Sequence, residues 1–142
     1  MRPIKLLAIA AGCYVVLVVA FECLVGFMGA RQAERGLEPG EDWVVITTRD
    51  EAGSPKNTVV AGVENDGKLY VSANHWPRAW YHRAVANPAV EVARGGQKVA
   101  GRAVPVSGEE RVRVERVYEL PWPIRFLTGF PPRSFLRLEL VP

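Results

Sequence analysis

The chain has 142 residues and a formal net charge of +3, which suits one compact domain with an extension. This charge is too small to indicate a nucleic-acid partner, and no nucleic-acid-binding motif occurs, so we expect none. Both cysteines lie in an apolar N-terminal segment, which excludes a disulfide-stabilised secreted domain. The two histidines have no cysteine near them, so no zinc-site spacing is present and we expect no metal.

The N-terminal segment has the length and composition of a membrane-spanning helix. Residues 6–21 carry no charge, and with Glu22 at one interface residues 3–21 come close to the roughly 20 residues that cross a bilayer. We therefore predict an anchor helix over residues 1–30. A cleaved signal peptide and a lipoprotein site at Cys13 are the alternatives, and Glu22 either lies at the interface or has a function inside the membrane. Basic residues flank both ends, so charge leaves the orientation open.

A domain rich in strands is expected over residues 43–142, after a polar linker over residues 31–42. Strands are predicted from β-branched composition and apolar alternation over residues 43–49, 56–63, 68–73, 89–94, 97–106 and 134–141. The Asn-Asp-Gly sequence at residues 65–67 predicts a tight hairpin, and Gly101 indicates a bulge in its strand.

Two short helices interrupt the strands. Residues 79–86 contain no helix breaker and are followed by an Asn-Pro pair. Ser107 and Glu110 have the spacing of a capping box, which opens a helix predicted to end near Glu119. The resulting order, β-β-β-α-β-β-α-β with short loops, favours antiparallel pairing. We expect a mainly β fold, a small closed six-stranded barrel preceded by one transmembrane helix, because closure leaves no exposed strand edge.

The domain carries no self-sufficient catalytic motif, so we expect a cofactor to supply any reaction. Two segments stand out. The segment 53–58 combines a turn, a cation and hydroxyls, which suits a phosphate or carboxylate. The segment 74–88 combines aromatic residues and arginines where a strand meets a helix. It either holds a planar ring, with anionic groups near Arg78, or places Trp80 and Tyr81 in the barrel core.

The sequence W-Y-H-R-A-V-A-N-P at residues 80–88, together with the segments 53–60 and 69–73, resembles the deazaflavin-dependent nitroreductases. These proteins belong to the split β-barrel superfamily that includes the pyridoxamine-phosphate-oxidase-like FMN-binding proteins. The resemblance covers about residues 40–142. It implies an antiparallel split β-barrel, the deazaflavin coenzyme F-420 with FMN as the alternative, and hydride transfer to a quinone- or nitro-type acceptor.

The resemblance also implies a cofactor site without catalytic side chains. Lys56 takes the position of an arginine that meets the acidic part of the cofactor. The implied cofactor-binding residues are Ser54, Lys56, Thr58, Ser72, Ala73, Asn74, Arg78, Trp80, Tyr81 and Asn87. The implied substrate-pocket residues are Trp76, Trp122, Phe126 and Phe130. The sequence departs from the family at Asp50 and Glu51, which replace a basic, glycine-rich turn.

These observations predict a membrane-anchored oxidoreductase with its barrel in the cytoplasm, where reduced deazaflavin is made. The expected partners are a small-molecule electron acceptor, membrane lipid around the N-terminal helix, and a second copy of the chain in a homodimer. The alternative is a non-catalytic split barrel that binds a flavin or deazaflavin, or no ligand, and serves as a carrier or interaction module.

Overall fold

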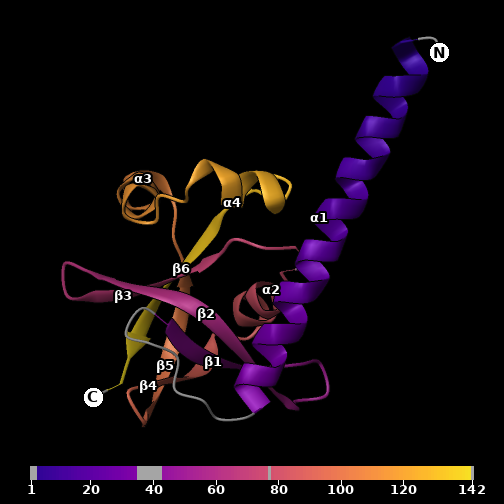
Figure 1. The fold of residues 1–142 in the computed structure, drawn as a ribbon. Helices are drawn as coiled ribbons and strands as arrows, with labels where there is room; N and C mark the ends of the chain where they lie inside the picture. The colour runs from indigo at the N-terminus through magenta and orange to yellow at the C-terminus, as the bar shows by residue number, and fades with distance from the viewer. Residues whose placement is uncertain (1–2, 35–42, 77, 142) are drawn as a thin grey trace.

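A closed barrel of six antiparallel strands forms the centre of the computed structural model, which describes residues 3–34, 43–76 and 78–141 (Figure 1). The strands are β1 (Trp43–Arg49), β2 (Pro55–Asn65), β3 (Lys68–Ala73), β4 (Ala89–Arg94), β5 (Gln97–Pro105) and β6 (Ser134–Leu140). They follow the order β1-β2-β3-β6-β5-β4, and pairing of β1 with β4 closes the barrel. The predicted fold class is confirmed.

Within the described residues, four helices accompany the barrel: α1 (Pro3–Glu34), α2 (Ala79–Ala86), α3 (Gly108–Val117) and α4 (Trp122–Leu127). The sequence predicts α2 and α3 but not α4, whose proline-rich start we expected only to end a helix. Proline is tolerated there because the N–H groups of a first helical turn have no partner within the helix. Of the predicted linker, residues 31–34 belong to α1, and residues 35–42 lie outside the described residues.

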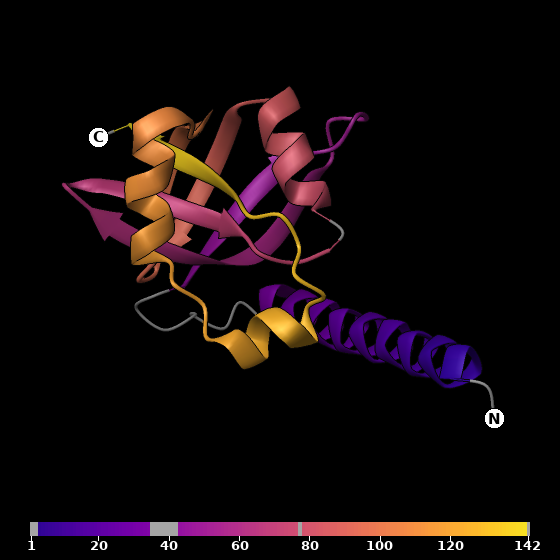
Figure 2. The ribbon, with the colours of Figure 1, turned by 90° about the horizontal axis from the view of Figure 1, so that it is seen from above.

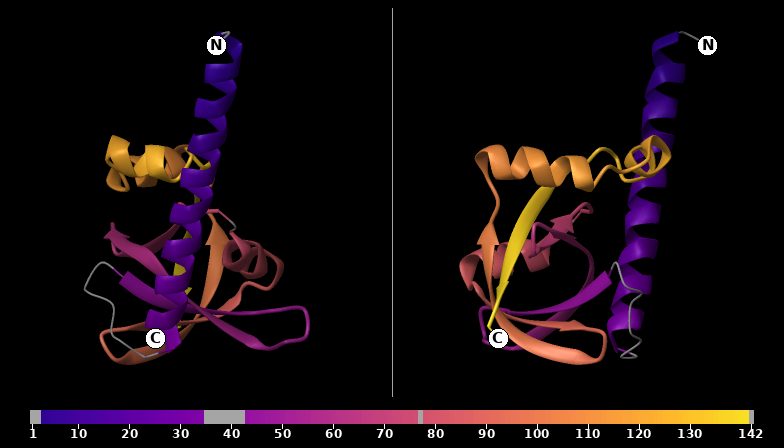
Figure 3. Two further views of the ribbon diagram at one scale, coloured as in Figure 1. Left: turned by 45° about the vertical axis from the view of Figure 1, so that its right-hand side comes forward. Right: turned by 90° about the vertical axis from the view of Figure 1, so that its left-hand side faces the viewer.

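The helices lie on different sides of the barrel. Figure 2 shows α4 between α3 and α1, with α2 on the opposite side. Figure 3 shows α1 running alongside the barrel, while α3 and α4 form a layer crosswise to it. Beyond this layer, the N-terminal part of α1 extends away from the rest of the molecule.

Glycines take special roles in one hairpin and one strand. Asp66 and Gly67 have φ angles of 51° and 69°, the left-handed conformation that a two-residue type I′ turn requires. Gly101 does not form the predicted bulge, because the register between β4 and β5 is uninterrupted. A Cβ at Gly101 would lie 3.0 Å from the carbonyl oxygen of Glu139, so glycine is needed for the close approach of β6.

Strand β3 is buried on both faces. Val71 faces the barrel interior, and Tyr70 faces an outer apolar layer beneath α3. In that layer the Tyr118 hydroxyl donates a hydrogen bond to the Tyr70 carbonyl at 2.6 Å, and burial raises the pKa of Tyr118. Because a slip by one residue would exchange the two faces of β3, this double burial restricts its register.

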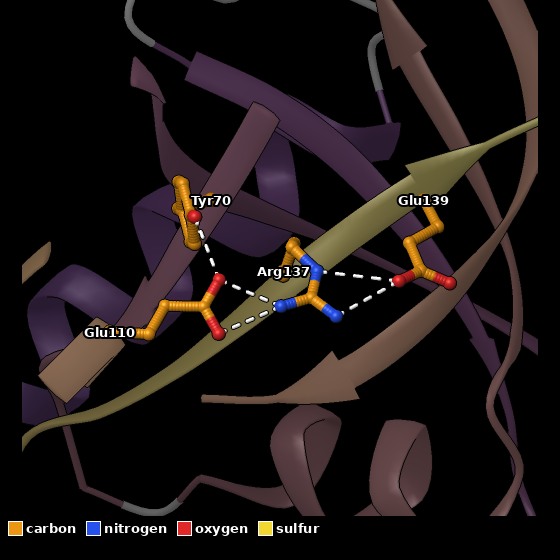
Figure 4. A network of polar contacts seen from close by, with 4 residues as sticks. All are labelled: Tyr70, Glu110, Arg137 and Glu139. Carbon is orange, nitrogen blue, oxygen red and sulfur yellow. Dashed lines mark hydrogen bonds and ion pairs between the residues drawn. The ribbon is translucent and has the colours of Figure 1, made fainter. Parts of the chain in front are cut away.

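An ion-pair network joins α3 to the outside of the barrel (Figure 4). Ser107 is the N-cap of α3 but makes no side-chain capping bond, so the predicted capping box does not form. Glu110 instead accepts a hydrogen bond from the Tyr70 hydroxyl at 2.8 Å and two from Arg137 Nη1 at 2.7 Å. Arg137 also donates to Glu139. Its guanidinium holds the pKa of Glu110 below the usual value.

Replacing Glu110 with glutamine should destabilise the barrel by about 1–2 kcal/mol at pH 7, because Arg137 and Tyr70 lose a charged acceptor. The pKa of Glu110 is lower in the folded chain than its ordinary value of 4.5. The stabilisation is therefore complete above that value and is lost as the pH falls through the folded pKa. Guanidinium unfolding in detergent should separate the parent from the variant strongly at neutral pH and weakly in acid. Glu109→Gln, on the same helical turn but exposed, is the matched control, and equal effects of both substitutions would contradict this role.

Candidate functional site

A cavity of about 360 Å³ lies between α1 and the barrel. Its volume falls within the range of small-molecule sites, about 300–1,000 Å³. One wall is α1, which contributes Val25, Gly26, Gly29 and Ala30. A Cβ built at Gly26 or Gly29 would meet no atom within 4 Å, so the small residues leave this space open.

The opposite wall is the outer face of β1, β2 and β3. Trp43 pairs with Ala61 across β1 and β2, and both alternate with residues of the barrel core. Residues 57–61 of β2 line the cavity, together with Ser72 of β3. Three tryptophans, Trp43, Trp76 and Trp80, add aromatic surface.

The helix wall is attached to the barrel through one carboxylate. Glu22 Oε1 lies 3.1 Å from His75 Nδ1, and Glu22 Oε2 accepts a hydrogen bond from the Trp76 backbone N–H at 3.1 Å. The Glu22 side chain is only 9% exposed. A charged group on an apolar helix must find polar partners when it leaves water, and the segment after β3 supplies them. In the structure Glu22 therefore joins α1 to the barrel, a role that the sequence did not predict.

Asn74 lines the cavity, and hydrogen bonds hold its side-chain amide in place. Its side-chain oxygen accepts hydrogen bonds from the Ser72 hydroxyl and from Arg133 Nε, the latter at 3.1 Å. Arg133 also donates to the Tyr118 carbonyl. These bonds orient the Asn74 amide, whose nitrogen makes no hydrogen bond among the described residues. Asn57 is similar, because its oxygen accepts from the Thr47 hydroxyl at 2.8 Å.

The structure brings several predicted site residues together around the cavity and leaves others apart. The predicted residues that line it are Thr58, Ser72, Asn74, Trp76 and Trp80. Ala73 and Trp80 are buried in the barrel core, and Tyr81 packs against that core, as the core alternative for Trp80 and Tyr81 predicted; Trp80 also lines the cavity.

Like Ala73 and Tyr81, the four remaining predicted cofactor residues lie outside the cavity lining. Lys56, on β2 next to the cavity residues 57–61, is half exposed and its Nζ is 3.5 Å from Asp50 Oδ2. Ser54 lies in the preceding turn, where its N–H donates to Asp50. Arg78 donates to the Pro132 carbonyl and the Ser134 hydroxyl, both at 2.8 Å, and Asn87 is the exposed C-cap of α2.

The other predicted substrate residues form a separate aromatic cluster on and after α4. Trp122 stacks on Phe126 with ring centroids 5.3 Å apart, and Phe130 meets Phe126 edge-on at 6.4 Å. Phe126 contacts Tyr14 of α1 at 4.8 Å. Tyr14 lies eight residues before Glu22, so this contact is about 12 Å along α1 from the start of the cavity.

Much of the cavity wall comes from residues that the sequence analysis did not assign to the cofactor or the substrate. These residues are Glu22, Val25, Gly26, Gly29, Ala30, Trp43, Asn57, Val59, Val60, Ala61 and His75. Two signals for the α1 residues were present in the sequence: a lone carboxylate in an apolar helix, and two glycines three residues apart on the same side of it. Neither signal identifies the surface against which the helix packs.

The chain matches the family model described as F-420H(2)-dependent quinone reductase over residues 28–125. Among solved structures it is similar to the F420-H2 dependent reductase FDR-A, with 24% identity and a TM-score of 0.54 over 69% of this chain and 94% of that one. A structure described as a domain-swapped dimer shares 24% identity, with a TM-score of 0.55 over 77% and 95% of the two chains.

General Stress Protein 26 of Bacillus anthracis shares 19% identity, with a TM-score of 0.54 over 71% of this chain and 81% of that one. At such identities the three structural likenesses show the fold. No curated protein sequence matches the chain.

Glu22→Leu should loosen α1 from the barrel, because the Trp76 N–H loses its acceptor and His75 loses its partner. We expect amide exchange at Trp76 to accelerate about tenfold or more, measured by hydrogen–deuterium exchange of the full chain in lipid nanodiscs. Glu22→Gln, which keeps one carbonyl acceptor, should give a smaller increase. Unchanged exchange in Glu22→Leu would show that this contact does not hold the helix in place.

Proposed function

Because the chain belongs to the F-420H(2)-dependent quinone reductase family, an oxidoreductase family whose coenzyme is F-420, we propose that it is a membrane-anchored reductase of quinone-type acceptors. The cofactor ring would bind in the cavity between α1 and the barrel. The observation that carries this proposal is a cavity with aromatic walls and oriented amide donors, one side of which is an apolar helix.

The residues present fit a deazaflavin ring. A planar ring system with carbonyl oxygens needs flat apolar surfaces and N–H donors. Trp43, Trp76 and Trp80 supply aromatic surface, and the Asn57 and Asn74 amide nitrogens supply donors. The Asn74 amide is held from behind by two hydrogen bonds, so its donor is preorganised.

When bound, reduced F-420 would supply the hydride for reduction of the acceptor. The chain itself would hold the ring and exclude water. Val25 and Ala30 of α1 cover the cavity with apolar surface, and Glu22 keeps that cover in place. Glu22 and His75 are the ionisable residues among the described lining residues, and they contact each other.

Lys56 would meet the anionic part of the cofactor. It directly precedes Asn57 and Thr58, which line the cavity, so a chain of acidic groups that leaves the cavity along β2 reaches the Lys56 ammonium first. Asp50 lies 3.5 Å from this ammonium and competes for it. The strength of tail binding therefore depends on the balance between these two charges.

We propose that α1 anchors the chain in the membrane. Residues Pro3–Arg31 form one helix long and apolar enough to cross a membrane. Quinones that dissolve in the bilayer would then meet a cavity that begins at Glu22, next to the span. The barrel would face the cytoplasm, the source of reduced deazaflavin, and protease protection in oriented vesicles tests this orientation. A homodimer stays a prediction, to be tested by the mass of the detergent-solubilised protein.

Gly26→Leu should fill the cavity and lower the affinity for F-420 about tenfold or more, measured by titration of the full chain in nanodiscs. Gly12→Leu is the matched control, because Gly12 is a glycine of the same helix that does not line the cavity and whose Cβ would also meet no atom. The parent should bind F-420 and reduce menadione. No binding of F-420 to the parent would overturn the proposed function and favour a non-catalytic module. Equal binding by Gly26→Leu and Gly12→Leu would show that F-420 does not bind in this cavity.

Two charge substitutions should change the affinity for F-420 in opposite directions. Lys56→Glu should weaken binding about tenfold or more, because it places a carboxylate in the path of an acidic tail. Asp50→Asn should strengthen binding, because it frees the Lys56 ammonium while its side-chain oxygen can still accept from the Ser54 N–H. The same titration at low and high salt tests the electrostatic origin. Unchanged affinity in both variants would remove Lys56 from the site.

A further inference from the structure

We propose that α4 is a membrane-interface helix, which lies at the boundary between the headgroups and the acyl chains, with its apolar side chains among the upper acyl chains beside α1. This inference rests on the membrane anchoring proposed for α1. It assigns to the aromatic cluster of α4 a partner, the lipid surface, and it determines how deeply the whole domain sits against the membrane.

The apolar residues of α4 are part neither of the barrel core nor of the outer apolar layer beneath α3. The helix contains no buried residue. Trp122 is 65% exposed, Ile124 37% and Phe130 45%. A cluster of exposed aromatic and aliphatic side chains that serves no core is typical of an interaction surface.

The length of α1 places α4 within the membrane boundary. A span over residues 3–21 is about 28 Å long, close to the thickness of the hydrocarbon core, and puts the boundary at Glu22. The contacts of α4 with α1 lie inside this boundary. The Tyr14 ring contacts the Phe126 ring, and a Cβ at Gly129, just after α4, would be 2.9 Å from Val18 Cγ1.

These contacts lie four to eight residues from Glu22, which corresponds to a depth of about 6–12 Å along α1. Amphipathic helices that lie in a membrane interface bury their apolar face to a depth of about 5–10 Å. If α1 spans the bilayer while it keeps its contacts with the barrel, α4 must therefore lie at interfacial depth. The crosswise orientation of α4 relative to α1 is the one such a helix needs (Figure 3).

Few backbone polar groups at the ends of α4 need water as a hydrogen-bond partner. Its first turn contains proline, which has no N–H group to satisfy. At its end the Thr128 hydroxyl donates to the carbonyls of Ile124 and Arg125, at 2.9 and 3.1 Å. The Phe126 carbonyl accepts from the Tyr14 hydroxyl at 2.9 Å. Pairing of these polar groups lowers the cost of transfer to a low-dielectric environment.

Lipid is the occupant that fits this surface best. The aromatic cluster is continuous with the apolar surface of α1 through the contact between Tyr14 and Phe126. Tryptophan is enriched at membrane interfaces, and the guanidinium of Arg125, 5.8 Å from the Phe130 ring centroid, can reach a phosphate from there. A protein partner on α4 would instead have to displace lipid from the adjacent turns of α1.

The test is fluorescence quenching of the full chain, reconstituted in vesicles of phosphatidylcholine brominated on the acyl chains. In the parent, bromine at upper acyl positions should quench more strongly than bromine near the chain ends. Trp122→Phe should lose about half or more of this quenching, whereas Trp43→Phe, whose ring lines the cavity outside the boundary, should keep it. In Trp122→Phe the new phenylalanine preserves an aromatic contact with Phe126, and unchanged F-420 affinity of this variant would show that the site is intact.

Two results would overturn the proposal, and they are distinguishable. If the chain floats with the vesicles but Trp122→Phe is quenched as much as the parent, α1 anchors the protein and α4 does not touch lipid. If the chain does not float with the vesicles, the membrane anchoring of α1 fails together with the inference that rests on it. Vesicle flotation is therefore measured on every sample.

Discussion

The contact between Glu22 and the segment after β3 is the constraint on which the site depends. A carboxylate in an apolar helix has no partner on its own helix, and leaving it unpaired out of water would be costly. His75 and the Trp76 N–H supply the partners. This contact turns an apolar helix into one wall of a cavity, because Gly26 and Gly29 lie one and two turns further along α1. Helix α1 thus belongs both to the proposed membrane anchor and to the proposed binding site.

The barrel supplies the rigid half of the site. Strand β3 is buried on both faces, and the Glu110–Arg137 ion pair ties α3 to the neighbouring strand β6. Ser72 lies in β3 and Asn74 directly follows it, and the Ser72 hydroxyl and Arg133 Nε both donate to the Asn74 oxygen. The Asn74 amide is therefore oriented by Ser72 and Arg133, as a preorganised site requires.

The proposed membrane span and the cavity adjoin each other along α1. Helix α4 contacts α1 on the N-terminal side of Glu22, and the cavity lies on the C-terminal side. The turns of α1 before Glu22 expose apolar side chains, and those after it line the cavity. An acceptor that leaves the bilayer along α1 would pass from lipid to a small-residue wall without crossing much water. Exposing apolar surface to water costs about 25 cal/mol per Å². A path that keeps the acceptor out of water avoids this cost.

The sequence by itself determined the barrel, the apolar helix, and the segments around Thr58 and Trp80, because hairpin turns and alternating apolar residues are local signals. The resemblance named the coenzyme, which the family match supports. Only the tertiary structure decided that Glu22 bonds the barrel, that Glu110 pairs with Arg137 rather than capping its helix, and that the α4 aromatics lie apart from the cavity. Those outcomes depend on which distant surfaces meet, and no local pattern specifies the partner of a side chain across the fold.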